Sequence, residues 1–435
     1  MSEELLNLLS KIPELKVIGR TSSFSFKGKN EDLRIIGEKL GVAHILEGSV
    51  RKQGNKVKIN AQLISVENGY QLWSQQFDRS LDDVFVIQEE IALAITQKLK
   101  ITLLQNEKLE IGKGLTNSKE AYDAYLKGRH FWYLRKLKES EQFFKQAIDL
   151  DPFFASAYAG LAVTYVLFPF YRFGTPHESM PKAQEAAEKA IQANSALAEP
   201  YASLAWKNFI YDWQPDAAKK YFEKAMRINP HYSPVHYWYG QYLAYYASDS
   251  TMAIAEMRKG LELDPLDPVA HFSLGVTLKQ LNKLNEAIQA FKTAIEFNVE
   301  YSNAYLNMGY CYLGIGKVDD ALKAFNKSAQ LSNDWAQAVL IYFYENNRQH
   351  GQAKAAFDEL LKRSQIEYIP KSSLAIAASF LGQKDLAHEL LKKAFEERDT
   401  RLVHYKLFTV PLPKDLLKDP RNMKLFEQFK LPDWR

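Results

Sequence analysis

The sequence of 435 residues has few of the features that mark specialised protein classes. It contains one cysteine, Cys311, which excludes an internal disulfide and any cysteine-rich zinc site. A lone thiol fits a reducing compartment, although an oxidising one stays open. The longest apolar patch, at 165–170, is broken by Pro169, and no uninterrupted apolar run of about 18 residues occurs. The sequence therefore predicts no membrane span.

Charge of one sign is not in excess either. The 56 basic and 52 acidic residues leave a net charge of +4, which predicts no strong attraction to nucleic acid or anionic lipid. The N-terminus begins with Glu3 and Glu4 and lacks the basic and long apolar regions of a secretory signal. We expect a cytoplasmic location, with a periplasmic one as the alternative if a membrane anchor lies upstream.

Most of the chain follows a fixed period. Residue pairs that end helices recur in steps of about 34 residues after one longer first step. These pairs are Asp151-Pro152, Asn194-Ser195, Asn229-Pro230, Asp264-Pro265, Asn298-Val299 and Ser332-Asn333. A period of this length predicts repeated helical hairpins, and an irregular helical bundle does not predict it.

Within each period, small residues and large apolar residues keep fixed positions. One unit has Leu274-Gly275, Leu278, Ala287 and Phe291, and the next repeats the pattern with Met308-Gly309 and Phe325. Small residues allow two helices to cross closely, while Leu and Phe fill the seam. This pattern resembles the tetratricopeptide signature. It predicts an all-α superhelix of about eight hairpins over 119–399, followed by a capping segment at 400–435.

Residues 1–110 follow a different rhythm and predict an α+β domain. Helices are expected at 2–10 and 31–40, and a short buried strand at 15–18. Apolar residues alternate with polar ones from Lys56 to Leu63, and hairpin turn signals stand at Gln53-Gly54-Asn55 and Asn68-Gly69. Strands at 44–52, 56–66 and 70–77 therefore form an antiparallel meander, and an amphipathic helix follows 80–83.

Several short motifs carry a family resemblance in this N-terminal part. They are Glu3-Glu4-Leu5, Val17-Ile-Gly-Arg-Thr-Ser-Ser-Phe24, Phe26-Lys-Gly-Lys29, Leu46-Glu-Gly-Ser-Val-Arg51 and Gln71-Leu-Trp-Ser74. They are similar to the bacterial TolB-like, or FlgO-like, domain. The segments Glu397-Arg-Asp399, Asp419-Pro-Arg-Asn422 and Leu431-Pro432 resemble the cap that follows the repeats in such proteins.

The resemblance implies what the chain is joined to in related proteins. There, the two parts are attached to adenylate or guanylate cyclases, kinases or winged-helix DNA-binding domains. That domain also begins with an apolar strand, whereas this chain begins at the helix. Either the sheet has an uncovered edge that seeks a partner strand, or the true start lies upstream of Met1. We favour the second interpretation.

The tetratricopeptide resemblance also nominates a groove. The first helix of each hairpin is expected to face the concave side, with groove residues three before and one or four after the small crossing residue. The candidates are Tyr125, Arg129, Trp132, Trp206, Phe209, Tyr237, Gln241, Phe272, Lys279, Leu306 and Tyr310. This set is aromatic with sparse charge, unlike the Lys and Asn lattice that clamps a C-terminal carboxylate. It predicts an apolar or aromatic peptide partner. The alternative is that these rings pack between adjacent repeats.

The insertion at 168–180, rich in aromatic residues and proline, accounts for the longer first step. It is either a packed surface loop or a lip of the groove.

No catalytic constellation accompanies this framework. The Lys27-Gly28-Lys29 motif lacks the other residues of a phosphate-binding loop, His177-Glu178 stands alone, and Cys311 has the setting of a packed thiol. We therefore expect a non-catalytic scaffold without cofactor or metal that binds a protein or peptide in bacterial signalling. The alternative is a regulatory fragment of a nucleotide cyclase or transcriptional activator, with the effector domain upstream. The sequence offers no prediction of oligomeric state.

Overall fold

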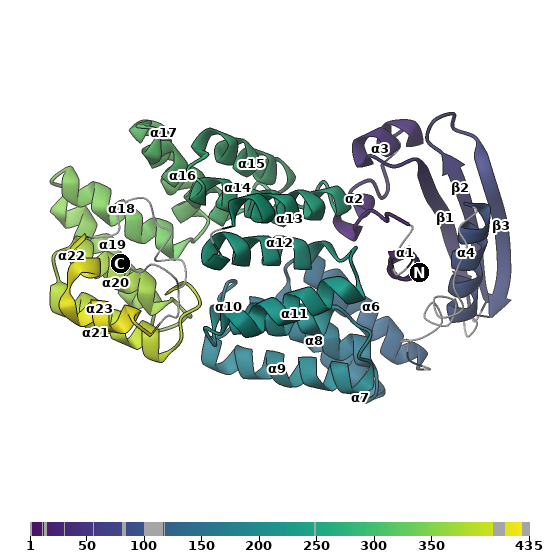
Figure 1. The fold of residues 1–435 in the computed structure, drawn as a ribbon, viewed down its shortest axis with the longest axis horizontal. Helices are drawn as coiled ribbons and strands as arrows, with labels where there is room; N and C mark the ends of the chain where they lie inside the picture. Colours follow the sequence, from purple (N-terminus) through teal and green to yellow (C-terminus); the bar gives the residue numbers. More distant parts are fainter. Residues whose placement is uncertain are drawn as a thin grey trace.

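The N-terminal part is built around a three-stranded antiparallel sheet, and the rest of the chain is a helical superhelix (Figure 1). The structure, a computed structural model, describes residues 2–10, 12, 15–29, 31–54, 56–80, 84–99, 116, 118–247, 249–402 and 414–428. Among these residues, none of the helices combines the length and apolar character needed to cross a bilayer. Leu431-Pro432 of the predicted cap lies outside the described part.

The sheet contains β1 (His44–Gln53), β2 (Lys56–Ser65) and β3 (Gln71–Ser80), in that order. Alternate residues of β2, from Val57 to Leu63, are buried, as the period of two predicts. Helices α1 (Ser2–Ser10) and α4 (Val84–Lys98) share one apolar cluster with this face. Helix α3 (Leu33–Leu40) begins at the capping residue Asp32 and ends at Gly41, whose φ of 65° suits glycine.

The strand predicted at 15–18 is wrong. Residues 15–19 have no regular secondary structure and lead into the short helix α2 (Arg20–Phe24). At the end of this segment, the amide of Gly19 donates to the carbonyl of Leu263 in the repeats. At the same place Asp264 accepts hydrogen bonds from the amide and hydroxyl of Ser22. The segment therefore joins the two parts of the molecule.

Eight helix pairs occupy the predicted repeat region within residues 118–247 and 249–402. They are α6 (Lys119–Tyr133) with α7 (Leu137–Leu150), α8 (Ala155–Leu167) with α9 (Pro176–Ala193), α10 (Glu199–Ile210) with α11 (Pro215–Ile228), α12 (Ser233–Tyr242) with α13 (Ser250–Leu263), α14 (Pro268–Gln280) with α15 (Leu284–Phe297), α16 (Ser302–Gly314) with α17 (Val318–Gln330), α18 (Asp334–Asn346) with α19 (His350–Arg363), and α20 (Lys371–Phe380) with α21 (Lys384–Glu396). A π-helical segment, η2 (Leu243–Ala247), follows α12.

The hairpins are held by a repeated contact between a small residue and a ring. A Cβ added at Gly309 of α16 would lie 2.6 Å from the ring of Phe325 on α17, which is fully buried. Gly275 meets Phe291 at the same 2.6 Å. The helices therefore cross where glycine leaves room for the phenylalanine, as the repeat pattern predicts.

The superhelix curves until distant hairpins meet. Arg172, in the loop after α8, donates to the carbonyl of Ser332 at 2.6 Å, and His177 Nε2 lies 2.8 Å from the carbonyl of Glu396. Arg398 donates to the carbonyl of Tyr211 at 3.0 Å. Hairpins two and three thus contact hairpins seven and eight.

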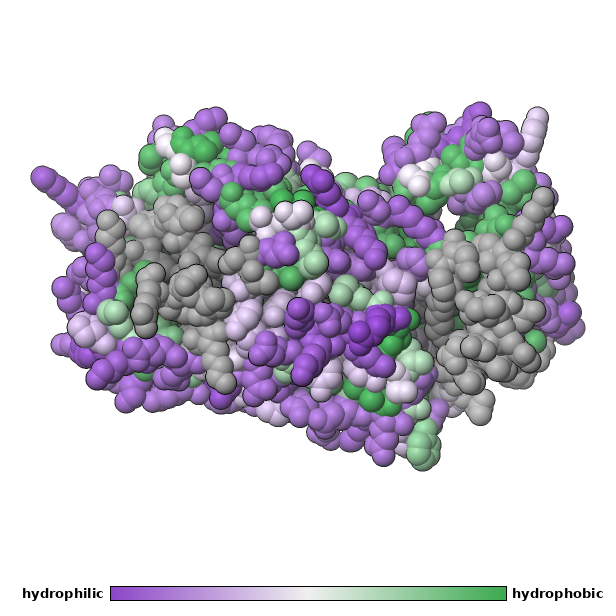
Figure 2. All heavy atoms as spheres, in the orientation of Figure 1, coloured by the Kyte–Doolittle hydropathy of each residue, from purple (hydrophilic) through white to green (hydrophobic). Residues whose placement is uncertain are grey.

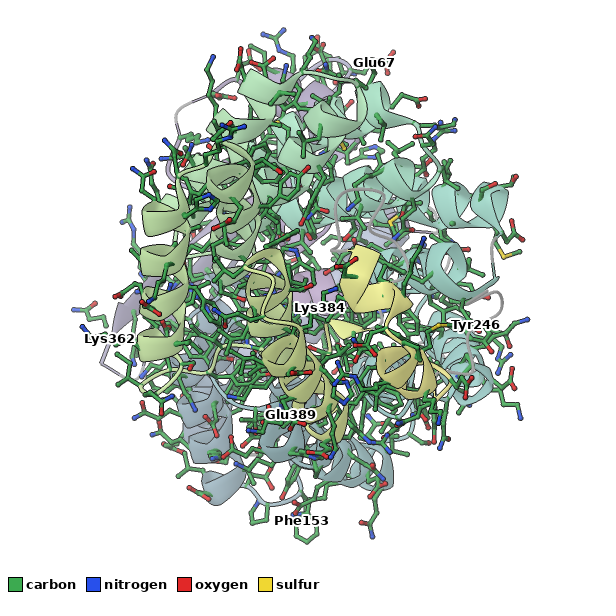
Figure 3. All side chains as sticks on the ribbon, turned by 90° about the vertical axis from the view of Figure 1, so that its left-hand side faces the viewer. Glu67, Phe153, Tyr246, Lys362, Lys384 and Glu389 are labelled. Atoms are coloured by element: carbon green, nitrogen blue, oxygen red, sulfur yellow. The ribbon has the colours of Figure 1, made fainter. Side chains whose placement is uncertain are left out.

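After the last hairpin, the described residues 414–428 contain two short helices, α22 (Lys414–Lys418) and α23 (Pro420–Phe426). Phe426 packs against Phe395 of α21 with ring centroids 5.4 Å apart. The face drawn in Figure 2 is mostly hydrophilic, with hydrophobic residues in small groups. Phe153, 85% exposed, projects from the periphery in Figure 3.

Candidate functional site

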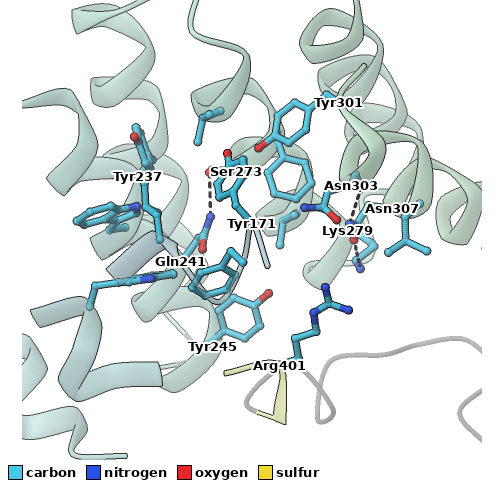
Figure 4. Close-up of a pocket in the computed structure, with 18 of the residues that line it drawn as sticks. Tyr171, Tyr237, Gln241, Tyr245, Ser273, Lys279, Tyr301, Asn303, Asn307 and Arg401 are labelled. Atoms are coloured by element: carbon cyan, nitrogen blue, oxygen red, sulfur yellow. Dashed lines mark hydrogen bonds between the residues drawn. The ribbon is translucent and has the colours of Figure 1, made fainter. Parts of the chain in front are cut away.

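A cavity of about 190 Å³ lies on the inner side of the superhelix. Its walls come from the first helices of hairpins two to seven, from the loop after α8 and from Arg401 (Figure 4). The lining residues are Leu167, Phe170, Tyr171, Trp206, Tyr237, Trp238, Gln241, Tyr245, Val269, Phe272, Ser273, Val276, Lys279, Tyr301, Asn303, Leu306, Asn307, Trp335 and Arg401. The insertion predicted as either a surface loop or a lip therefore contributes two aromatic residues to this wall.

Much of the cavity lining is aromatic. Trp206 stacks on Trp238 with ring centroids 5.5 Å apart, and Phe170 packs on Trp206 at 6.2 Å. Phe272 and Tyr301 lie 4.9 Å apart. The indole N–H of Trp206 is buried and has no hydrogen-bond partner among the residues described. A buried donor of this kind costs on the order of 1–3 kcal/mol unless an acceptor reaches it.

Polar side chains lie among these rings in the cavity lining. Lys279 Nζ donates to Asn307 Oδ1 at 2.7 Å, and Asn307 Nδ2 donates to the carbonyl of Asn303 at 2.9 Å. Gln241 Nε2 donates to Ser273 Oγ at 2.8 Å, and Figure 4 shows both side-chain pairs. Burial lowers the pKa of Lys279 to about 8. The lysine thus remains mostly charged at neutral pH in a largely apolar setting.

A buried ion pair closes one end of the cavity. Arg401 donates to Asp334 Oδ2 at 2.6 Å, and Ser373 Oγ donates to the same oxygen at 2.6 Å. Asp334 is 1% exposed. Burial alone raises the pKa of Asp334, but the charge of Arg401 and these hydrogen bonds hold the pKa below its usual value. Arg172 reaches within 4.0 Å of Asp334, so the same carboxylate joins hairpin two to hairpin seven.

The structure brings six of the eleven predicted groove residues to this cavity: Trp206, Tyr237, Gln241, Phe272, Lys279 and Leu306. Arg129 and Trp132 line a second cavity of about 70 Å³ beside the N-terminal domain, which Tyr237 also lines.

The remaining three predicted residues pack against neighbouring rings. Tyr125 lies 5.0 Å from Phe154, and Phe209 lies 5.7 Å from Trp206. The hydroxyl of Tyr310 accepts from Trp335 Nε1 at 2.7 Å. For these three side chains the packing alternative describes where they lie.

The expected hairpin offsets did not identify all the polar residues that line the cavity. Asn307 stands two residues before the crossing Gly309, a position that the expected offsets leave out. Together with Lys279 and Asn303 it forms a short lysine and asparagine chain, although the sequence analysis expected none. Arg401 carried no signal, because it follows the last hairpin and reaches the cavity through the curvature of the superhelix.

Comparison with known proteins identifies the repeats. One model described as TPR repeat matches residues 275–316, and one described as tetratricopeptide repeat matches 256–289. Another tetratricopeptide repeat model matches 124–154, 214–232 and 302–334. The chain contains tetratricopeptide repeats. The TolB-like resemblance of the N-terminal domain stays a prediction.

The chain matches two curated relatives, each over only part of the relative's length. A segment of 210 residues, 47% of this chain, is 31% identical to 36% of "Putative adenylate cyclase 3" of Rhizobium meliloti (strain 1021). A second segment, 41% of this chain, is 26% identical to 19% of human "Protein O-mannosyl-transferase TMTC3". The chain thus spans about a third of the length of the first relative and about a fifth of the length of the second.

Solved structures resemble the chain more distantly, with TM-scores below 0.5. The human IFIT1 dimer with m7Gppp-AAAA has a TM-score of 0.46 and 15% identity, and the match covers 72% of this chain and 77% of that one. A thermophilic TPR protein of Thermus thermophilus has a TM-score of 0.37 and 17% identity, covering 44% and 99% respectively.

Proposed function

We propose that the chain is a non-catalytic scaffold that binds an extended segment of a partner protein in the cavity of its superhelix, as part of a bacterial signalling system. The matched tetratricopeptide repeats indicate a protein–protein interaction scaffold. The observation behind the proposed binding site is the cavity itself, which lies on the inner side of the superhelix and has a largely aromatic lining that includes Trp206, Phe272 and Lys279.

The size of the cavity limits what enters it. At about 190 Å³ it is smaller than the roughly 300–1,000 Å³ typical of sites for drug-sized ligands. It accommodates an apolar or aromatic side chain of an extended segment rather than a folded element. The ammonium group of Lys279 would favour negative charge nearby. The rings of Trp206 and Phe272 supply the apolar contact.

A peptide-library selection on the full chain, followed by titration of the selected peptide, tests this proposal. Val269 is partly exposed and lines the cavity, so Val269→Trp fills the space without emptying the core. Phe153→Ala removes an exposed ring that does not line the cavity and serves as the matched control. We expect Val269→Trp to abolish binding and Phe153→Ala to leave it unchanged. Equal affinity for both variants would reject the cavity as the binding site.

A second candidate function is a regulatory part of a nucleotide cyclase. The observation that favours it is the 31% identity to a protein named as a putative adenylate cyclase, over 210 residues. The discriminating observation is the genomic sequence upstream of Met1. An in-frame cyclase motif there would favour this candidate, and an intergenic region there would count against it.

A further inference from the structure

The outer edge of β3 is open in the part of the chain that the structure describes. The sheet order is β1-β2-β3, so β3 pairs with β2 on one side and with no described strand on the other. Figure 1 places β3 at the outer border of the molecule, on the side of the sheet away from the repeats. The strand is ten residues long, and its sequence contains no proline and no lysine. It thus lacks two features that commonly protect an edge strand from pairing.

The pairing with β2 defines which part of β3 is regular. Ile59 pairs with Phe77 and Leu63 pairs with Trp73, but Ile64 pairs with Gln71, so a bulge occurs at Leu72. The regular segment therefore runs from Trp73 towards Ser80. Of its side chains, Phe77 is buried, Trp73 and Ser80 are partly buried and the others are exposed. A further antiparallel strand can continue the ladder along this segment.

We propose that β3 pairs with β3 of a second copy of this chain, antiparallel and centred on Gln76. In this register, the numbers of any two residues that face each other add up to 152. Trp73 lies opposite Arg79 of the second copy, and Ser74 lies opposite its Asp78. Each contact occurs twice because the interface has a two-fold axis. A guanidinium over an indole and a carboxylate beside a hydroxyl are both favourable cross-strand pairs.

Of the five other registers centred on residues 74–79, four fit less well; the fifth, centred on Phe77, places Gln76 opposite Asp78, so that Gln76→Lys would strengthen the dimer instead of weakening it. Centring the pair on Asp78 or on Arg79 places like charges opposite each other. Centring it on Ser74 or Gln75 draws the bulged Leu72 into the paired segment. The charged residues of β1, Glu47, Arg51 and Lys52, belong to the edge that faces the rest of the molecule in Figure 1. The six-stranded sheet of the pair would carry the two α4 helices on the same face. This inference is independent of the peptide cavity and goes beyond the proposed function.

The two-fold axis makes a charge-swap experiment possible, because Gln76 lies opposite itself. Gln76→Lys places two cations face to face, and Gln76→Glu places two anions there. We expect each variant to raise the dimer dissociation constant of the full chain by at least about tenfold, measured by sedimentation equilibrium. An equimolar mixture of the two variants restores a dimer, because lysine then faces glutamate. A fold defect in either variant would not be repaired by mixing.

A cross-linking experiment reads the register. Residues directly opposite across an antiparallel pair have Cβ atoms about 4.5–5.5 Å apart. Gln76→Cys is expected to cross-link with a short bifunctional thiol reagent, whereas the native Cys311 is fully buried. Ser49→Cys on the exposed edge strand β1 is the control and is expected to stay uncross-linked. A monomer at all accessible concentrations would overturn the proposal. So would a dimer that both charge variants leave intact, or one that Ser49→Lys disrupts.

Discussion

Replacing Gly309 with alanine tests the contact that builds the hairpins. The new Cβ would lie 2.6, 2.8 and 3.0 Å from three ring atoms of Phe325, and a ring with no exposed surface has little room to move. Overpacking of this kind costs about 1–3 kcal/mol. The better helix propensity of alanine offsets about 1 kcal/mol of it. We expect a net loss of up to about 2 kcal/mol in the free energy of unfolding.

The matched control is Gly351→Ala on α19. A Cβ at Gly351 meets nothing within 4 Å, so only the gain in helix propensity remains, up to about 1 kcal/mol. Urea unfolding followed by circular dichroism measures both variants under one condition. We expect Gly309→Ala to unfold at a clearly lower urea concentration than Gly351→Ala. If both variants unfold at the same urea concentration, the close crossing of α16 and α17 is not what the glycine permits.

Three further predictions concern charged groups. Arg401→Met leaves Asp334 buried without its main partner and should cost about 3–5 kcal/mol. Arg421→Ala removes only exposed ion pairs and should change stability little. Thermal unfolding compares the two variants, and equal melting temperatures would contradict the importance of the buried pair. Burial and the neighbouring carboxylate of Asp267 raise the pKa of Asp264 to about 7, above the unfolded value of 3.8, so the folded state holds the extra proton and stability falls as pH rises from about 4 to 7. Asp264→Asn should remove this loss in the free energy of unfolding, which is on the order of 2–4 kcal/mol between pH 5 and pH 8 in urea unfolding. An unchanged difference between the two pH values would refute the assignment to Asp264. Because the pKa of Lys279 is lowered to about 8, the affinity for an acidic peptide should fall between pH 7 and 9, and Lys279→Met should abolish this dependence in a fluorescence titration.

The local architecture could be predicted from the sequence because it depends on short-range patterns. The period of about 34 residues predicts the hairpins, and glycine facing phenylalanine predicts where they cross. The alternation in 56–63 predicts the buried face of β2. The strand expected at 15–18 is replaced by an irregular segment, and the residues that follow it, Gly19 and Ser22, bond to Leu263 and Asp264 of the repeats, more than 240 residues away.

The candidate site was predictable only in part. Hairpin offsets identify residues on the inner side, and six of the eleven predicted residues line the cavity. These offsets do not predict that distant hairpins meet, because the curvature of the superhelix is the sum of small rotations over many repeats. The contact of Arg172 with Ser332 joins residues 160 positions apart, and no local pattern contains it. The same curvature brings Arg401 to the cavity, so its role becomes visible only in the structure.

The affinity of the chain for its selected peptide, measured with and without the Val269→Trp substitution, decides whether the cavity is the binding site. Isothermal titration of the folded parent, of Val269→Trp and of the control Phe153→Ala gives three dissociation constants. The account predicts that the parent and Phe153→Ala bind alike and that Val269→Trp shows no measurable binding. Equal dissociation constants for all three proteins, each with native circular dichroism, would show that the partner binds elsewhere.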